Sequence, residues 1–347
     1  MVKRTTIRDV AEEAGVSPTA VSLVLNNRPS RVSDETRRLI VQAAEKLHYV
    51  PNQVARTLVT QRSMLMALIV PDIQNLFFAA LAKRVEDECH ASGYSLIISN
   101  TDDSRSGEHE VMERLAARGA DGMFIIPAGE SCLRPEEFRH DVEALHMPVV
   151  LMDRLADCGW CDGVGIDNRE GARLAAQLLL DCGHRRIACV SGGARVGNAG
   201  ERCDGFMEAL RDSPQQIEPV LLIEGDYRFS GGYVAADAIV DAGATAVFCC
   251  NDLMAMGVIR RLNERGLHVP DDLSVVGYDG LAERFGFGSE VTTIGQKIGW
   301  LSHEAWQLMV DRMKAGSDKP PRSVMLPPEL VKHGTVKVLR AEGSVAL

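Results

Sequence analysis

The chain has 347 residues, of which 46% are hydrophobic and 25% are charged, so it is too long for one compact domain and too apolar for wholesale disorder. No apolar run reaches the roughly 18 residues that a membrane helix requires, and no secretory signal opens the sequence, which predicts a cytoplasmic protein without a membrane partner. The net charge of −10 is unevenly distributed. Residues 1–62 hold ten basic and six acidic side chains, whereas the rest of the chain holds 28 basic and 42 acidic side chains. This distribution indicates that only the basic head contacts a polyanion.

The first 48 residues contain start and stop signals for three short helices. A capping-box-like start and a glycine stop bound residues 6–15, a serine followed by Pro18 opens residues 17–26, and another serine opens residues 33–48. Two short helices joined by a glycine-containing turn, with a third to complete the core, predict a small all-α helix-turn-helix domain over residues 1–48. One helix of such a unit fits the major groove of DNA. The alternative, a purely structural bundle, is disfavoured by the basic surplus.

The head and the segment that follows it carry a family resemblance. Residues 6–26, TIRDVAEEAGVSPTAVSLVLN, and residues 49–58, YVPNQVARTL, resemble the head and hinge of the LacI/GalR family of bacterial repressors. The resemblance implies a repressor that binds a double-stranded, pseudo-palindromic operator as a homodimer, with a hinge helix and linker over residues 49–62.

The same resemblance assigns individual residues to the DNA. Those that it places on the operator are Thr6, Ser17, Pro18, Thr19, Ser22, Leu23, Asn26, Tyr49, Asn52, Ala55 and Leu58. Leu58 matches an apolar wedge that enters the minor groove and unstacks a base step, although a leucine at this position could also be ordinary core. Leu23 departs from the basic side chain that many members carry, which leaves it only apolar contact, for instance with a thymine methyl.

From residue 63 onward, apolar strands alternate with amphipathic helices. The expected strands are 65–71, 94–98, 122–127, 149–153, 187–190, 220–224, 246–250 and 273–278. The expected helices lie near 76–92, 107–118, 135–145, 169–182, 200–212, 230–242 and 252–265. Such alternation predicts an α/β body of two successive doubly wound lobes with parallel sheets.

Ligands of doubly wound sheets bind beyond the carboxyl ends of the strands, and polar and aromatic residues gather at these positions. The candidate effector-binding residues are Asn75, Phe77, Phe78, Asp153, Arg154, Arg202, Tyr227, Asn251, Asp279 and Gln296. Carboxylates, amides and an arginine fork suit vicinal hydroxyls, and aromatic faces suit the C–H face of a sugar. A sugar-like effector is therefore expected, although each residue taken singly could be a turn or core residue.

The body also resembles that of the family and, more distantly, periplasmic sugar-binding proteins. Segments such as 164–171 and 269–279 carry this likeness. It implies a periplasmic-binding-protein-like effector and dimerisation domain over residues 63–340. The expected first lobe covers about 63–162 and 292–320, and the expected second lobe covers about 163–291 and 321–340. A purine or another non-sugar co-repressor is the alternative effector within the same family.

Rival functions find little support in the sequence. The nine cysteines are read as reduced thiols, and the Cys158/Cys161 pair lies in a Gly/Asp-rich loop rather than at a helix start, so neither a metal nor a redox role is expected. The glycines of 192–197 lack the G-x-G-x-x-G spacing of a dinucleotide site, and no hydrolase or metalloprotease motif is present. The sequence predicts neither an enzyme nor a cofactor. A transport-type sugar receptor would need export, and this chain begins with a DNA-binding head instead.

Overall fold

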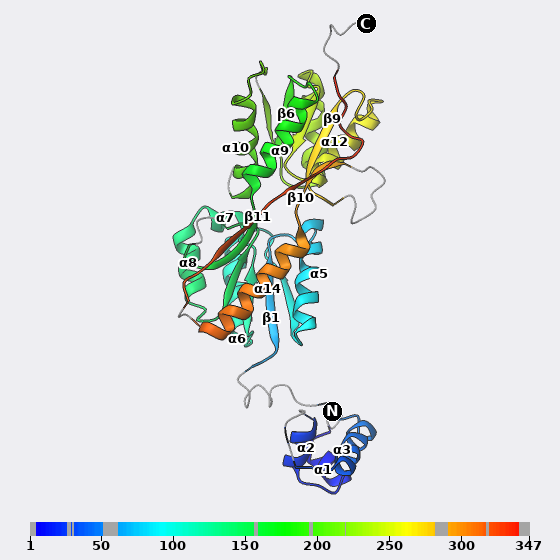
Figure 1. The fold of residues 1–347 in the computed structure, drawn as a ribbon, viewed down its shortest axis with the longest axis vertical. Coiled ribbons are helices and arrows are strands. Elements are labelled where there is room, and N and C mark those ends of the chain that lie inside the picture. Colours follow the sequence, from blue (N-terminus) through cyan, green and yellow to red (C-terminus); the bar gives the residue numbers. More distant parts are fainter. Residues whose placement is uncertain are drawn as a thin grey trace. The chain divides into compact units, whose positions relative to one another are not determined.

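The computed structural model describes residues 5–25, 29, 31–50, 62–155, 159–193, 197–218, 220–281, 291–316 and 319–339. The chain divides into two compact units, Met1–Ser63 and Met64–Leu347 (Figure 1). Within the described residues, no helix combines the length and the apolar character needed to cross a membrane.

The first unit is a three-helix domain formed by α1 (Ile7–Glu13), α2 (Pro18–Leu25) and α3 (Asp34–Lys46). The predicted capping box is present: the Thr6 side chain accepts from the Asp9 amide, and the Asp9 carboxylate accepts from the Thr6 amide. Val10, Val21 and Ile40, one from each helix, are fully buried against one another in the core of this unit. The predicted helix-turn-helix domain is confirmed.

The second unit holds two six-stranded sheets. The strands of the first sheet, in spatial order, are β11 (Ser323–Leu326), β5 (Asp162–Ile166), β4 (Val149–Met152), β3 (Gly122–Ile125), β1 (Leu65–Val70) and β2 (Ser95–Asn100). Those of the second sheet are β12 (Glu329–Val331), β10 (Thr292–Gly295), β9 (Ser274–Asp279), β8 (Ala246–Cys249), β6 (Ile187–Ser191) and β7 (Leu221–Glu224). All the pairings are parallel except that of β12 with β10. The predicted pair of doubly wound lobes is confirmed.

Helices cover both faces of the first sheet. They are α5 (Leu76–Ala91), α6 (Arg105–Ala117), α7 (Gly129–Cys132), α8 (Pro135–Glu143) and α14 (Ile298–Ala315). Met66 and Leu68 of β1 pack with α5 and α14, which lie side by side, whereas Ala67 and Ile69 pack with α6 and α8 (Figure 1). Because successive side chains of a strand point to opposite faces, a continuous apolar strand is buried on both.

The second sheet is covered by α9 (Asn168–Asp181), α10 (Asn198–Arg211), α11 (Phe229–Asp241) and α12 (Asp252–Glu264). These helices and the strands between them share one apolar core, in which the rings of Phe206 and Phe248 stack with their centroids 4.7 Å apart. Each buried aromatic side chain removes about 150–250 Å² from water, so this pair is a main anchor of the lobe.

In the described part of the second unit, the chain crosses between the two lobes three times, each time one strand later than the sequence suggested. Strand β5 belongs to the first sheet, so the first crossing follows Ile166 instead of residue 162. Strand β10 belongs to the second sheet, and β11 belongs to the first. The expected boundaries at 291/292 and 320/321 are therefore wrong. The physical reason is that each strand completes its pairing with its neighbours, as Val164 does with Val324, before the chain leaves the sheet.

Candidate functional site

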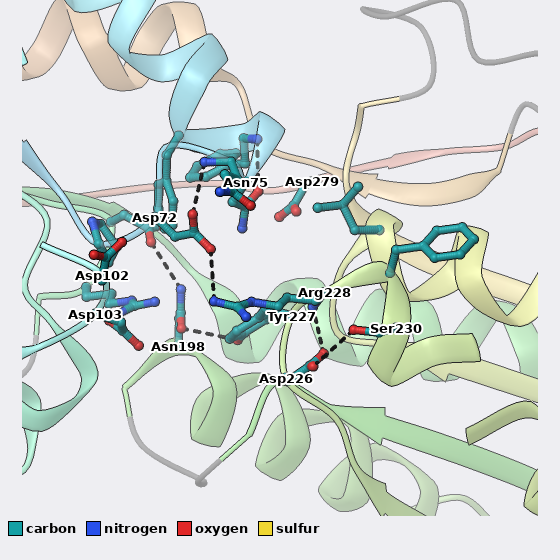
Figure 2. A pocket seen from close by; sticks show the side chains of 18 of the residues that line it. Asp72, Asn75, Asp102, Asp103, Asn198, Asp226, Tyr227, Arg228, Ser230 and Asp279 are labelled. Atoms are coloured by element: carbon teal, nitrogen blue, oxygen red, sulfur yellow. Dashed lines mark hydrogen bonds and ion pairs between the residues drawn. The ribbon is translucent and has the colours of Figure 1, made fainter. Parts of the chain in front are cut away.

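A cavity of about 490 Å³ opens between the carboxyl ends of the two sheets of the second unit (Figure 2). Its walls come from loops at the strand ends of both lobes and from the first turns of the helices that follow them. The lining residues are Pro71, Asp72, Gln74, Asn75, Phe77, Phe78, Asp102, Asp103, Asp153, Arg154, Asn198, Arg202, Asp226, Tyr227, Arg228, Phe229, Ser230, Leu253 and Asp279. The volume lies within the range of about 300–1,000 Å³ that small-molecule sites occupy.

Eight of the ten expected effector residues line this cavity. They are Asn75, Phe77, Phe78, Asp153, Arg154, Arg202, Tyr227 and Asp279. Asn251 and Gln296 do not line it. Asn251 caps α12 by accepting from the Met254 amide, and it donates to the Tyr227 carbonyl at 2.8 Å. Gln296 donates to Asp279 Oδ1 at 2.7 Å, so both residues lie behind the wall and position it.

The sequence reasoning missed several lining residues on the same strand-end loops. Asp72 lies in the loop after β1, and Asp102 and Asp103 lie in the loop after β2. Strand β2 runs to Asn100 and not to residue 98, so the loop after it received no candidate. Helix α10 starts at Asn198 and not near residue 200, which makes Asn198 its first residue and places Arg202 inside the helix instead of at its start. The strand-end rule, applied to the true ends, finds Asp72, Asp102 and Asp103, whereas Phe229, Ser230 and Leu253 lie in the first turns of α11 and α12.

Arg202 is the most heavily bonded side chain in the wall. Its Nε donates to Asn168 Oδ1 at 2.8 Å, and its Nη1 donates to the Cys250 carbonyl at 2.7 Å. Nη1 also lies 3.5 Å from Asp279 Oδ1, and the guanidinium carbon lies 3.7 Å from the centroid of the Tyr278 ring. Because only 2% of Arg202 is exposed, these partners must together replace its hydration.

Asp153 offers an acceptor that the described residues do not use. Its Oδ2 accepts from Asn198 Nδ2 at 3.1 Å, while its Oδ1 is buried and has no hydrogen-bond partner among the residues that the structure describes. Burial raises the pKa of Asp153, and the charges of Arg202 and Arg154 oppose that rise. A buried polar atom without a partner costs free energy, so Oδ1 is the natural acceptor for a ligand hydroxyl.

Among the described residues, two polar links join the lobes around the cavity (Figure 2). In the first, the Tyr227 hydroxyl donates to Asn198 Oδ1 at 3.2 Å, and Asn198 donates in turn to Asp153 of the other lobe. In the second, Arg228 lies 3.6 Å from Asp72 across the cavity, with its side chain 71% exposed. The first link is buried and the second is largely solvated, so the first contributes more to holding the lobes in this arrangement.

The charge of the wall is predominantly negative. Six aspartates and three arginines line the cavity. All three arginines have protein partners: Arg202 donates to Asn168 and the Cys250 carbonyl, Arg154 donates to Asp103 at 2.7 Å and to the Pro127 carbonyl at 3.0 Å, and Arg228 pairs with Asp72. The wall therefore presents mainly acceptors to a ligand, which favours a donor-rich neutral or cationic molecule over an anion.

Backbone strain is concentrated at the cavity. Of the eight non-glycine residues with positive φ in the described part of the chain, five line it, namely Asp102, Asp103, Asp153, Tyr227 and Asp279. Such residues cost on the order of 1–3 kcal/mol each and persist only where the surroundings hold them. At Asp153 and Asp279, with φ of 63° and 112°, the strain aims the carboxylates into the space between the lobes.

A carboxylate of the first lobe is buried outside the lining of the cavity. Glu108 of α6 is fully buried, its Oε1 accepts from the Ala128 amide at 2.7 Å, and its Oε2 accepts from the Ser131 hydroxyl. Burial raises the pKa of Glu108 to about 7, against the lowering effect of these two hydrogen bonds. The carboxyl thus ties α6 to the segment that opens α7.

This carboxyl predicts a pH dependence of stability. Because its pKa is higher in the folded chain than the 4.5 of the free group, the folded state holds the proton more tightly, and stability falls as pH rises from 4.5 through 7. The loss from Glu108 amounts to about 3 kcal/mol at most. Glu108→Gln, which can bond to both partners, should flatten the slope of the unfolding free energy between pH 5 and 8, measured by urea denaturation. An unchanged slope would contradict this assignment.

The expected DNA-binding residues of the head fall into three groups. Pro18 and Thr19 are exposed at the start of α2, and Ser22 and Leu23 are half-buried one turn later. Thr6 and Ser17 cap α1 and α2 with their side chains, and Tyr49 packs against the core of the head. The remaining expected contacts, Asn26, Asn52, Ala55 and Leu58, lie outside the described residues, as does most of the expected hinge.

Two segments of the chain match known families. Residues 6–52 match the bacterial regulatory proteins of the lacI family, and residues 176–336 match the periplasmic binding protein-like domain. The HTH-type transcriptional repressor PurR of Vibrio atlanticus (strain LGP32) is 33% identical over 337 residues, which cover 96% of this chain and 99% of that protein.

Solved structures show the same fold. The lac repressor dimer bound to operator and the anti-inducer ONPF matches with a TM-score of 0.83 and 27% identity, covering 96% of this chain and all of that one. A LacI family transcriptional regulator of Enterococcus faecalis V583 with bound ribose matches with a TM-score of 0.71 and 29% identity, covering 80% of this chain and all of that one. These likenesses span the head and both lobes.

Proposed function

This chain belongs to the lacI family of bacterial regulatory proteins and is a DNA-binding transcriptional repressor, and from this premise we propose that the cavity between its lobes binds a small effector that changes operator affinity. The observation that carries the proposal is the buried Asp153 Oδ1, which has no hydrogen-bond partner among the described residues and lies in a strained wall built by both lobes. DNA binding alone does not explain a buried carboxylate oxygen that faces a cavity in the second unit. We assign the chain no catalytic activity and place it in the cytoplasm.

We propose a neutral sugar as the effector class. Hydroxyl groups donate to carboxylates, and the wall offers six aspartates. An acidic sugar would need Arg154 and Arg202, but both already donate to protein acceptors. The related regulator with bound ribose shows that this fold accommodates a neutral pentose. The alternative is a purine or another non-sugar co-repressor, which would use the aromatic rings of the wall for stacking.

A thermal-shift screen separates these effector classes. Neutral pentoses and hexoses, sugar acids, sugar phosphates and purine bases are added to the full chain, and the midpoint of unfolding is recorded. A ligand that binds only the folded state at 100 times its Kd stabilises the chain by about 2.7 kcal/mol, which is easily seen. Stabilisation by neutral sugars supports the proposal, and stabilisation by purines alone supports the alternative.

The proposed mechanism is a shift between lobe arrangements. A ligand that touches Asp153 of one lobe and Tyr227 of the other adds to the polar link through Asn198, so it binds one arrangement better than another. The effector acts on DNA only through this difference in affinity. In a dimer, such a shift changes the spacing of the two heads on a pseudo-palindromic operator.

Leu58 in the expected hinge supplies a test of how the operator is bound. If it enters the minor groove, Leu58→Ala removes the wedge that holds a bent duplex, and specific binding should weaken by more than non-specific binding. The measurement compares the Kd on an operator selected from random duplexes with the Kd on unselected DNA at the same salt concentration. Equal losses on both DNAs would mean that Leu58 is only a packing residue.

A further inference from the structure

Three buried thiols meet in the core of the second lobe. Cys189 lies on β6, Cys203 on α10, and Cys250 directly after β8, so segments far apart in the sequence bring them together. Their sulfur atoms all lie within 4.8 Å of one another, and each residue is fully buried. We propose that this thiol cluster is a binding site for one Cu(I) ion with three sulfur ligands.

The spacing of the sulfurs suits a single metal ion. Cys203 Sγ and Cys250 Sγ are 3.9 Å apart. Two thiolates bound at about 2.3 Å to one ion, at tetrahedral or trigonal angles, are separated by about 3.8–4.0 Å. The cluster therefore needs only small side-chain adjustments to close on an ion, and no backbone segment has to move.

The composition of the cluster selects among metals. Among the described residues, no histidine or carboxylate joins the three cysteines as a fourth ligand. Zinc in proteins is almost always four-coordinate, and a fully buried apolar site leaves no place for a water ligand. Soft thiolate ligands favour Cu(I), which accepts three sulfurs. The donor set thus favours a monovalent soft ion over zinc.

The surroundings compensate part of the charge that binding creates. Hydrogen bonds to Cys203 and Cys250, together with burial, raise the pKa of Cys189, so an ion that binds this thiol must displace its proton. Arg202 adjoins Cys203 in sequence and donates to the Cys250 carbonyl at 2.7 Å. Its positive charge acts on Cys250, where it offsets part of the negative charge of a copper–thiolate complex.

The test is a competition for Cu(I) between the full chain and a colorimetric Cu(I) chelator, without oxygen and without thiol reductants. All proteins carry Cys158→Ala, which removes the C-x-x-C pair as a competing two-sulfur site. This parent should retain one Cu(I) per chain. Adding Cys189→Ala, Cys203→Ala or Cys250→Ala should each abolish retention, whereas adding Cys249→Ala, a change at an equally buried cysteine outside the cluster, should leave it intact.

X-ray absorption on the copper-loaded parent gives a second test, because it measures the number of sulfur ligands without replacing any cysteine of the cluster. Three sulfur neighbours at about 2.3 Å are expected. Two-sulfur coordination, loss of all retained copper in the Cys158→Ala parent, or equal retention in the cluster variants and in Cys249→Ala would each overturn the proposal.

Discussion

Replacing Arg202 with alanine should abolish the response to effector and lower the free energy of unfolding by about 3–5 kcal/mol, because the change leaves a buried carboxylate without its cation. Asp279 would keep Gln296 Nε2 as a donor but lose the guanidinium 3.5 Å away. The Cys250 carbonyl and Asn168 would lose their donors as well. Urea denaturation measures the stability, and calorimetry measures ligand binding at a temperature where the variant is folded.

Asp153→Asn is the matched variant that separates binding from folding. The amide has the size of the carboxylate, and its oxygen can still accept from Asn198, so stability should change little. Ligand affinity should fall by about 1.5–3 kcal/mol, the usual contribution of a hydrogen bond to a charged group. If both variants bind ligand as the wild type does, these residues do not form the site and the assignment of a sugar-like effector fails.

Deletion of residues 1–62 should abolish operator binding and leave effector binding and dimerisation intact. The head has its own core around Val10, Val21 and Ile40, and the cavity is built entirely from residues of the second unit. The measurements are gel shift on operator DNA, calorimetry with the effector and sedimentation for the oligomeric state. Loss of effector binding in the truncated chain would contradict the separation of the two functions.

The sequence predicted those features that depend on local signals. Capping residues and proline positions located the three helices of the head, and continuous apolar runs such as 65–71 located strands buried on both faces. The search at strand ends and helix starts then found eight of the nineteen residues that line the cavity, because carboxyl ends of parallel strands share one edge of a sheet. These predictions needed no knowledge of how the lobes pair.

Features that depend on tertiary pairing could not be predicted in the same way. Strand β5 has the sequence DGVGI, too rich in glycine to read as a strand, and it forms because β4 and β11 flank it. The late crossings were missed for the same reason, whereas the buried residues of helix α14 follow helical spacing, a local signal that was overlooked. Asn251 and Gln296 have the chemistry of ligand contacts, but only the fold shows that their bonds go to the wall itself. The thiol cluster of Cys189, Cys203 and Cys250 likewise could not be predicted, because the fold brings together three residues that are far apart in the sequence.

The most direct test of the effector-gated repressor is the Kd for a selected operator with and without a saturating ligand, measured by fluorescence anisotropy for the wild type and Asp153→Asn. The ligand is the sugar that stabilises the wild type most in the thermal-shift screen. The wild-type Kd should change by about tenfold or more in one direction, in line with coupling energies of about 1–3 kcal/mol, while the variant should need far more ligand for the same change. A cavity ligand that leaves the wild-type Kd unchanged would contradict the account.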